Sequence, residues 1–504
     1  MTPRRALCLI ALSAMIAAPA CADPAFENDA GGLPFAHVYS GGWEHFVGGG
    51  VAVFDCNGDA KPDLFAAGGS GPAALFVNRS EPGGALQFAD GHAPEILETT
   101  GAYPLDINGD GVMDLAVLRV GANQLLRGLG NCQFEDATAT WGLPSNDAWT
   151  TAFTATWEAG QARPTLFFGN YVDRANPDGP FEACDRSQLI RPDGEGYGRV
   201  EQIDPGYCTL SALISDWQRN GDPQLRLSND RHYYVHGGYE QMFELSPLHE
   251  RPDWKHVSLW GMGIASRDIT GDGLPEVMMT SMGDQLLQFN RGTGFENAPF
   301  AIGTYSQRPF LGDDGRPSTG WHAEFGDVDN DGRADLFIAK GNVDQMPSNA
   351  IHDPNNLLMQ RADGTFVEKA DVAGIATTDR SRGAALVDLN ADGRLDLVVM
   401  NRRAPMELWR NVTADTGHWA GVALSQPGPN RNAVGAWVEI RSDGRVQSQE
   451  VTVGGGHAGG QAGPLHFGLG AMTQAEARVI WPDGRVDSWR SIAPDRCTQI
   501  SRAD

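Results

Sequence analysis

A ten-residue acidic motif recurs along the chain, and its spacing limits the possible folds more than any other feature. Each intact copy has Asp at positions 1 and 5, Asp or Glu at position 9, and an apolar residue at position 10. Five such copies start at Asp55, Asp106, Asp268, Asp327 and Asp388. Two further segments, starting at Trp157 and Asp216, align in the same frame but have lost most of the acids. The seven starts lie 51 to 61 residues apart, and such a period with several short strands per unit is typical of propeller blades.

Each unit offers enough apolar segments for four strands. One apolar run precedes the acidic loop, a second follows it, and two shorter runs, such as 74–78 and 87–89, come next. Apolar runs bounded by Gly and Asn are typical of strands that are buried on both faces. The last unit lacks a fourth run. We therefore expect residues 34–38 to complete it, which would remove an exposed sheet edge.

The period stops after residue 411. The rest of the chain carries short alternating runs separated by glycine-rich turns, which indicate a small antiparallel β domain. The sequence therefore predicts an all-β protein with two folded parts. Residues 23–412 form a seven-bladed β-propeller whose N-terminal strand closes the last blade, and residues 413–504 form a β-sandwich-like domain.

The acidic loops carry the oxygen ligands that calcium prefers. Ca²⁺ takes about six to eight oxygens in a flexible geometry, and side chains at positions 1, 3, 5 and 9 can converge on one ion together with the position 7 carbonyl. A solvated turn is the alternative, because Asp, Asn and Gly are ordinary turn formers, but five copies in register favour metal. We expect about five structural ions, one per loop, that couple metal binding to folding. The expected ligands are Asp55, Asn57, Asp59, Lys61 and Asp63; Asp106, Asn108, Asp110, Val112 and Asp114; Asp268, Thr270, Asp272, Leu274 and Glu276; Asp327, Asp329, Asp331, Arg333 and Asp335; and Asp388, Asn390, Asp392, Arg394 and Asp396.

The charge of the chain excludes several classes of partner. The formal net charge is −26, and a surface of this sign opposes binding to nucleic acid or to anionic membranes. Of the 64 acidic side chains, 16 lie in the five intact loops. Much of the acidity is therefore explained by ligands, and the remainder by a solvated surface.

The N-terminus is typical of an export signal. Arg4 and Arg5 precede an apolar stretch over 6–18, and the small residues at 20–22 form a cleavage site. We expect residues 1–22 to be removed and the protein to be secreted or periplasmic, without a transmembrane segment. Lipidation of Cys21 is a less favoured alternative.

Five cysteines remain after removal of the signal, in a compartment that permits disulfides. Cys184 and Cys208 flank one polar insertion and are the preferred pair. Cys56 with Cys132 is a weaker pairing, and Cys497 is left over.

Aromatic and histidine residues stand where several blades begin. In a propeller these positions gather around the central channel, on the face opposite the acidic loops. They form a candidate surface for binding a sugar or a peptide, although large side chains that simply fill the channel would give the same pattern. The candidates are Trp43, His45, Trp149, Trp260, Trp321 and His322.

The motifs together resemble known families. The acidic units resemble the FG-GAP or VCBS repeats of integrin-α-type propellers. The C-terminal segment resembles the ASPIC/UnbV domain through the motifs at 430–436, 454–457, 465–470 and 481–484. The combination is similar to the family of cartilage acidic proteins. This resemblance implies a secreted, calcium-binding propeller with adhesive or matrix roles, and the loops at 157 and 216 depart from it because their acids are missing.

No phosphate loop, dinucleotide fingerprint, nucleophile elbow or zinc-protease motif occurs in the sequence. The sequence therefore favours a non-catalytic module that binds an extracellular or envelope protein or a glycan. A polysaccharide lyase or hydrolase built on a calcium-rich propeller is one alternative, and a structural component of a larger envelope complex is another.

Overall fold

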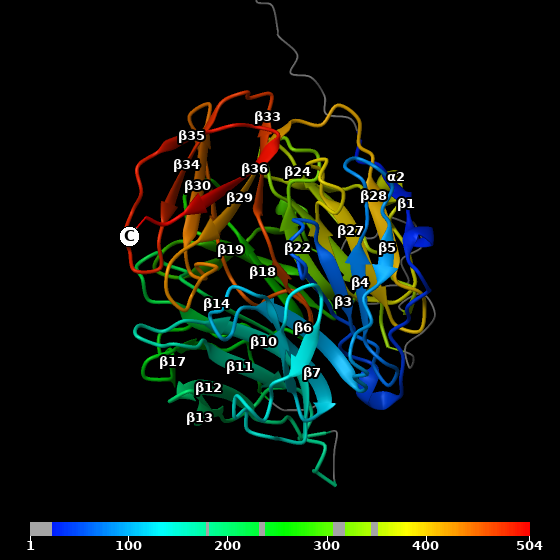
Figure 1. Cartoon of the computed structure of the whole chain (residues 1–504), viewed down its shortest axis with the longest axis vertical. Coiled ribbons are helices and arrows are strands. Elements are labelled where there is room, and N and C mark those ends of the chain that lie inside the picture. The colour runs from blue at the N-terminus through cyan, green and yellow to red at the C-terminus, as the bar shows by residue number, and fades with distance from the viewer. Residues whose placement is uncertain (1–22, 178–180, 231–236, 306–317, 344–350, 504) are drawn as a thin grey trace, which may run out of the picture.

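The computed structural model describes residues 23–177, 181–230, 237–305, 318–343 and 351–503. The predicted signal at 1–22 lies outside these residues. Figure 1 shows a body made almost wholly of strands. The helical elements described are short and lie between strands: η1 (Ala30–Gly32), η2 (Trp43–His45), η3 (Phe300–Ile302) and α2 (Ala370–Ala373). Among the described residues, none of the helices has the length and apolar character needed to cross a bilayer.

Seven antiparallel meanders of four strands succeed one another in the described part of the chain, and the second and third of them share one eight-stranded sheet. The first four units contain β2 (Val51–Phe54), β3 (Asp63–Ala66), β4 (Ala74–Asn78) and β5 (Phe88–Asp90); β6 (Thr99–Leu105), β7 (Asp114–Gly121), β8 (Gln124–Gly128) and β9 (Phe134–Asp136); β10 (Ala148–Thr156), β11 (Thr165–Asn170), β12 (Ser187–Asp193) and β13 (Gly196–Ile203); and β14 (Thr209–Ser215), β15 (Gln224–Asn229), β16 (Met242–Glu244) and β17 (His249–Glu250).

The last three units repeat the same meander. Their strands are β18 (Gly261–Arg267), β19 (Glu276–Ser281), β20 (Leu286–Asn290) and β21 (Phe295–Asn297); β22 (Gly320–Gly326), β23 (Asp335–Lys340), β24 (Asn356–Gln360) and β25 (Phe366–Glu368); and β26 (Ser381–Val387), β27 (Asp396–Asn401), β28 (Glu407–Asn411) and β1 (Phe26–Asn28).

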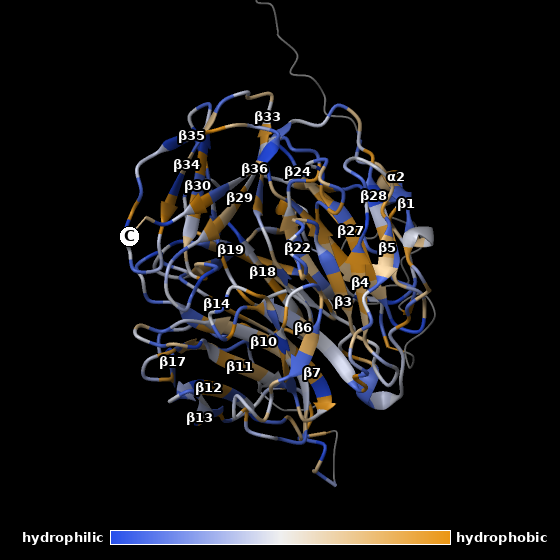
Figure 2. Ribbon diagram, viewed as in Figure 1, coloured by the Kyte–Doolittle hydropathy of each residue, from blue (hydrophilic) through white to orange (hydrophobic). Residues whose placement is uncertain are grey.

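The first strands of the units follow one another around a common axis. β2 contacts β6, the contacts continue through β10, β14, β18 and β22 to β26, and β26 contacts β2. These inner strands are almost completely buried, whereas the fourth strands are largely exposed. The hydropathy colouring in Figure 2 follows this gradient, because apolar runs lie in the sheets and polar residues in the loops. Every acidic loop joins the first and second strand of its unit, so all of them lie at one end of the axis.

The N-terminal segment completes the last unit, but with different residues from those predicted. β1 (Phe26–Asn28) pairs with β28, whereas residues 34–38 form no strand and contribute only a bridge between Val38 and Pro405. Phe26 is buried in the apolar core between the sixth and seventh units, whereas Phe35 is 42% exposed. Burial of one aromatic ring therefore decides which of the two apolar segments joins the sheet.

Residues 413–503, called the C-terminal domain below, form two sheets that share one apolar core. One sheet has the order β33-β29-β36 and the other the order β31-β30-β34-β35. The prediction of an antiparallel domain needs two corrections, because β29 and β36 are parallel and β32 leaves the domain to pair with β2. The strands are β29 (His418–Ser425), β30 (Trp437–Ser442), β31 (Arg445–Glu450), β32 (Gln461–Ala462), β33 (Leu465–Gly470), β34 (Ala475–Ile480), β35 (Arg490–Ile492) and β36 (Arg496–Ser501).

Candidate metal centre

The five acidic loops share one hydrogen-bonding pattern at their first position. In the sixth unit, one Asp327 carboxylate oxygen accepts the Asp331 amide at 2.9 Å and the other accepts the Gly332 amide at 2.7 Å. The position 1 carboxylate also accepts the amide of position 6 in the other four loops, at 2.7–3.0 Å. The carboxylate thus folds the loop back on itself, and each position 5 side chain in turn accepts the amide of position 7. The residue at position 7 contributes its amide in all five loops, and in the sixth and seventh units the side chains of Arg333 and Arg394 also pair with the position 5 carboxylate.

The ninth position is the most buried part of each loop. Asp335 accepts the Val328 amide at 2.9 Å with one oxygen and the Gln360 amide at 2.8 Å with the other. The first amide belongs to the start of the loop and the second to the third strand of the unit. Asp63, Asp114 and Asp396 form the same two bonds in their units. One carboxylate therefore ties the loop to two strands.

Amide side chains at the ends of third strands join neighbouring loops. Asn411 donates to the carbonyl of Leu395 in its own loop and to that of Val328 in the preceding unit's loop. Asn290 and Gln360 also reach back to position 2 of the preceding loop. Asn78 of the first unit donates to Leu389 of the last unit at 2.8 Å. This last bond joins the two ends of the series.

The loop of the sixth unit gathers the densest group of acids. Carboxylate oxygens of Asp327, Asp329 and Asp335 lie within 4.8 Å of one another, and all three side chains are buried. Burial, followed by repulsion from the other acids of the loop, raises the pKa of Asp327 and Asp335 well above the usual range. The same two causes raise the pKa of Asp331 to about 6. A divalent cation among these oxygens would remove both penalties, so the residues fit a hard metal ion such as calcium.

Carboxyl groups at position 1 or position 9 of the other intact loops also have raised pKa values. Burial is the main cause in each, and it raises the pKa of Asp63 to about 6, of Asp114 to about 7, of Asp268 and Asp388 to about 6, and of Glu276 to about 8. Asp59, Asp110 and Asp272, at the fifth position, are exposed. These three loops therefore open to solvent at position 5, whereas Asp331 and Asp392 of the sixth and seventh units are half-buried. All five close into the protein at position 9. Asn57, Asn108, Thr270 and Asn390 hold the third position, where an amide or hydroxyl oxygen is available.

An arginine forms an ion pair at each of the two degenerate loops. In the third unit the buried Arg191 guanidinium donates to Glu158 of the loop at 2.6 Å and to Glu201. In the fourth unit Asp216 keeps the bond to the position 6 amide of Gly221, and Arg219 of the same loop pairs with Glu439 of the C-terminal domain. The expectation that these loops hold no calcium stays a prediction.

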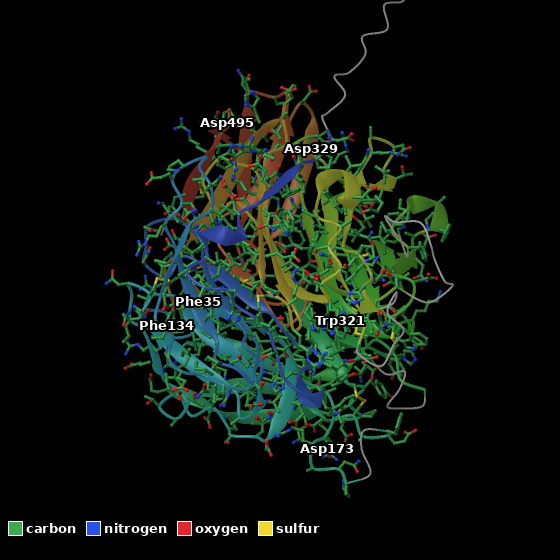
Figure 3. The ribbon with its side chains drawn as sticks, turned by 90° about the vertical axis from the view of Figure 1, so that its right-hand side faces the viewer. Phe35, Phe134, Asp173, Trp321, Asp329 and Asp495 are labelled. Carbon is green, nitrogen blue, oxygen red and sulfur yellow. A yellow bond between two sulfur atoms is a disulfide. The ribbon has the colours of Figure 1, made fainter. Side chains whose placement is uncertain are left out.

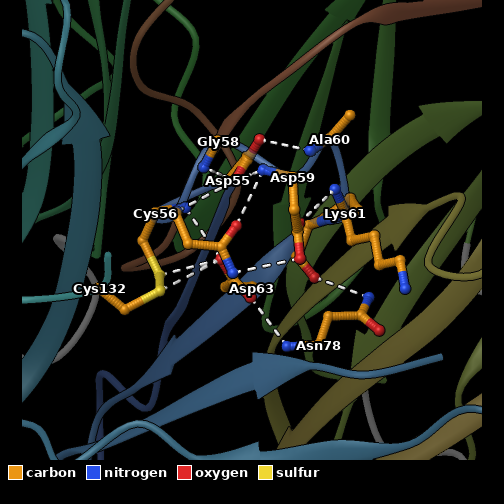
Figure 4. Close-up of a disulfide and its surroundings, with 11 residues drawn as sticks. Asp55, Cys56, Gly58, Asp59, Ala60, Lys61, Asp63, Asn78 and Cys132 are labelled. Atoms are coloured by element: carbon orange, nitrogen blue, oxygen red, sulfur yellow. Dashed lines mark hydrogen bonds between the residues drawn. A yellow bond between two sulfur atoms is a disulfide. The ribbon is translucent and has the colours of Figure 1, made fainter. Parts of the chain in front are cut away.

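Both predicted disulfides are present, Cys56–Cys132 and Cys184–Cys208, and among the described residues Cys497 is the free cysteine. Figure 4 shows the first of them at the first acidic loop. Cys56 occupies loop position 2, its sulfur lies 2.9 Å from a carboxylate oxygen of Asp63, and its carbonyl accepts the Cys132 amide. The disulfide thus joins the first unit to the second at the position where amide side chains join other pairs.

The predicted ligand-binding residues are mostly buried. Trp149 and Trp321 are 1% exposed, and His45 and His322 are also buried. Trp260 is half-buried, and only Trp43, at 47% exposure, faces solvent. Trp43 stacks on Phe46 and meets the edge of Trp149. Figure 3 places Trp321 well away from Asp329, which lies towards the C-terminal domain. Except for Trp43, these side chains pack the axis and do not line an open surface.

A glycine-rich segment of the C-terminal domain, which the sequence motifs did not place, enters the axis of the ring. Residues 453–461 form backbone bridges to the inner strands of five units: Val453 to Ala155, Gly454 to Leu213, Gly456 to Ile264, Gly459 to Ala102, and Gln461 to Val53. A side chain on Gly50 or Gly101 would collide with the Ala458 carbonyl. Five glycines within 454–460 are the sequence signal for such a close approach of backbones.

His457 is the centre of this inserted segment and is fully buried. Its ring nitrogens contact the Gly48 amide and the Met262 carbonyl, each at 3.1 Å, and its own amide donates to His322. The ring also packs against Trp321 with a centroid distance of 5.1 Å. Two residues that were predicted to bind a ligand therefore bind this segment of the same chain.

The architecture agrees with comparisons to known families. Residues 55–117, 268–338 and 327–399 match the FG-GAP-like repeat, and residues 426–504 match the ASPIC and UnbV domain. The chain is an FG-GAP repeat protein with an ASPIC and UnbV domain. Its curated relatives include cartilage acidic protein 1 from Homo sapiens, 36% identical over 88 residues, and from Xenopus tropicalis, 30% identical over 116 residues. These matches cover 16% and 22% of this chain but only 13% and 16% of the relatives' length.

Solved structures are similar only at low identity. BBS1N in complex with ARL6DN is 10% identical, with a TM-score of 0.47 over 76% of this chain and 96% of that chain. An Agrocybe aegerita lectin that recognises terminal N-acetylglucosamine is 14% identical, with a TM-score of 0.30 over 76% of this chain and 81% of that chain. Likenesses this distant say nothing about the function of the FG-GAP repeat protein.

Replacing Asn78 tests the bond that joins the first and last repeats. Asn78→Ala leaves the carbonyls of Pro62 and Leu389 without this donor, and we expect the free energy of unfolding to fall by about 2 to 4 kcal/mol. Asn432→Ala, at an exposed turn position of the C-terminal domain, should change it by about 0.5 kcal/mol or less. Denaturant unfolding measures both. Equal effects of the two substitutions would contradict a role in joining the ring.

Lowering the pH should destabilise the packing of the segment at 453–461, because protonation of His457 is unfavourable in its buried position. Burial lowers the pKa of His457 to about 3, whereas the unfolded chain takes up the proton near pH 6.5. Its contribution to stability is therefore complete above about pH 6.5 and is lost as the pH falls from there towards 3. Between about pH 7.5 and pH 5, wild type should lose roughly 2 kcal/mol more unfolding free energy than His457→Asn. Parallel pH profiles of the two proteins would refute this assignment.

Proposed function

We propose that the chain is an exported, calcium-stabilised β-propeller that acts as a non-catalytic binding module for an extracellular protein or a glycan. The loop of the sixth unit is the observation that carries the calcium part of this proposal. Three buried carboxylates converge there within 4.8 Å, and the same frame recurs in four other loops. The signal-like residues at 1–22 support export.

A closed ring of seven blades is the arrangement that best fits the units. The contact of β26 with β2, the bond from Asn78 to Leu389 and the pairing of β1 with β28 all join the two ends of the series. Further bonds between Gly83 and Asn390, and between Asn390 and Gly84, support the same closure. In such a ring the acidic loops face one end of the axis and the blade entrances face the other.

Calcium would act in the fold and not in chemistry. Each ion would be held by the position 1, 3, 5 and 9 side chains and the position 7 carbonyl of one loop, and it would supply the positive charge that the buried carboxylates need. The chain's own residues then do the structural work. The ninth-position carboxylate holds two backbone amides, and the third-strand amides hold the neighbouring loop.

A binding role is favoured over the carbohydrate-active enzyme. An enzyme would need a cleft with paired carboxylates near the axis, but Trp149, Trp321 and the segment at 453–461 fill the axis in the described residues. The exposed Trp43 beside Phe46 offers instead a flat aromatic surface, of the kind that packs on a sugar or on an apolar side chain.

Metal analysis tests the calcium proposal. Purified full-length protein should contain about five calcium ions, and a chelator should lower its melting temperature by several degrees, because the buried carboxylates lose their counter-ions. A variant with Asp327 and Asp335 both changed to Asn should bind one ion fewer. A calcium content of one or zero, or a melting temperature that chelator leaves unchanged, would exclude the structural role.

A screen of the calcium-loaded protein against glycans and extracellular proteins tests the binding role. We expect at least one ligand whose binding Trp43→Ala weakens about tenfold or more while the melting temperature stays unchanged. Leu129→Ala, a change of an apolar side chain of similar exposure, serves as the control. Release of new reducing or unsaturated sugar ends from a polysaccharide during the screen would favour the enzyme instead.

A further inference from the structure

The C-terminal domain lies directly on the acidic loop of the sixth unit. The Gly417 amide donates to the Asp329 carbonyl at 2.9 Å, and the Gly470 amide donates to the Asn330 carbonyl at 2.7 Å. The Arg445 guanidinium donates to the Gly332 carbonyl at 3.0 Å. Three successive parts of one loop thus supply backbone acceptors to three separate parts of the C-terminal domain.

Glycine in β33 allows this contact to be close. A Cβ atom built on Gly468 would collide with a carboxylate oxygen of Asp327, the first residue of the loop. Any larger residue at 468 would push the domain off the loop or displace the carboxylate. The backbone of β33 therefore packs against one of the proposed metal ligands.

The loop of the seventh unit makes a second contact of the same kind. His466 lies 3.1 Å from the Gly393 carbonyl, and the Trp419 indole lies so close to Gly393 that a Cβ there would collide with it. Asn330 of the sixth loop donates to the same carbonyl at 2.9 Å. The two loops and the C-terminal domain therefore form one connected hydrogen-bonded surface.

The acceptors in this surface are backbone groups whose positions depend on the loop's own carboxylates. The carbonyls of Asp329, Asn330 and Gly332 lie between the ligand positions at 327 and 335. Asp331 pairs with Arg333 of the same loop, but the carboxylates of Asp327, Asp329 and Asp335 lie within 4.8 Å of one another and repel. A bound cation would offset this repulsion and hold the turn closed. The positions of the carbonyls that accept from the C-terminal domain thus depend on the positive charge that neutralises the loop carboxylates.

We propose that calcium in the sixth acidic loop holds the C-terminal domain on the propeller, so that occupancy of this one site controls the docking of the two domains. This inference rests on the proposed calcium binding and goes beyond it, because it assigns an interdomain role to one loop and denies that role to another. In the part of the chain that the structure describes, no hydrogen bond joins the first loop, residues 55–63, to the C-terminal domain.

One further interdomain contact involves an intact loop, because the Arg431 guanidinium donates to the Gly109 carbonyl of the second loop. Further contacts that hold the domain lie in the fourth unit and along the axis. Arg219 pairs with Glu439, and Glu450 accepts the Ser215 hydroxyl and the Asp216 amide in the fourth unit. The segment at 453–461 remains held by the inner strands. Loss of calcium from the sixth loop should therefore release the side of the domain that faces the sixth and seventh loops, while the contacts in the fourth unit and along the axis remain.

Hydrogen–deuterium exchange of the full-length protein tests this inference. Peptides that cover 416–421 and 466–471 should exchange at least about tenfold faster after calcium is removed by chelation, whereas peptides covering 447–451 should change little. Asp331→Asn, in the sixth loop, should have the same local effect in the presence of calcium. Asp59→Asn, the same substitution at the same position of the first loop, should leave these peptides protected.

The outcomes separate the two proposals. If metal analysis shows that chelation removes calcium while exchange at 416–421 and 466–471 stays unchanged, the docking role is wrong and the calcium proposal stands. If the protein binds no calcium, both fail. If Asp59→Asn exposes these peptides as strongly as Asp331→Asn, calcium acts on the whole fold and the specific role of the sixth loop is overturned.

Discussion

The ninth-position carboxylate is the interaction on which the rest of the structure depends. Asp335, in the sixth unit, accepts one amide from the start of its loop and one from the third strand, so that a single side chain fixes three segments of a blade. Its burial also fixes the position of Gln360, which donates to the preceding loop. A local contact is thus transmitted around the ring. The cost is a desolvated negative charge in each of the five units that have an intact loop, because burial disfavours the ionised form.

The protein meets this cost in two ways. Five loops concentrate further acids beside the buried one, which worsens the repulsion unless a cation binds among them. The third and fourth units drop most acids and place Arg191 and Arg219 at the same end of the blade, where each pairs with a glutamate. The degenerate units are therefore not simply eroded copies. Their ninth positions hold the neutral Thr165 and Gln224, so these two units carry no buried carboxylate at that position.

The sequence was sufficient for the features that repeat and insufficient for those that occur once. The period, the loop frame and the strand order could be predicted because seven copies repeat the same local pattern. The position of β1 could not, because Phe26 and Phe35 both lie in short apolar segments and only the core decides which ring is buried. The aromatic residues near the axis were assigned to a ligand surface because local patterns do not reveal which distant segment fills a cavity. Trp321 and His322 contact His457, more than 130 residues away.

The glycine-rich segment links the blades of the propeller to one another along its axis. A ring of blades must bring its first and last units together, and the entropy cost of closing so long a chain grows only by about 0.6 kcal/mol for each doubling of its length. A few contacts between the ends therefore suffice, and β1 with β28 together with Asn78 and Leu389 supply them. The segment at 453–461 adds contacts of another kind, because it bonds to the inner strands of five units at once. A glycine backbone is thin enough to pass between the converging strands. Because the segment bonds to most of the blades, the opening of one blade is coupled to the opening of the others. The C-terminal domain is thereby an internal component of the propeller, so loss of its outer contacts with the acidic loops would not separate the two domains.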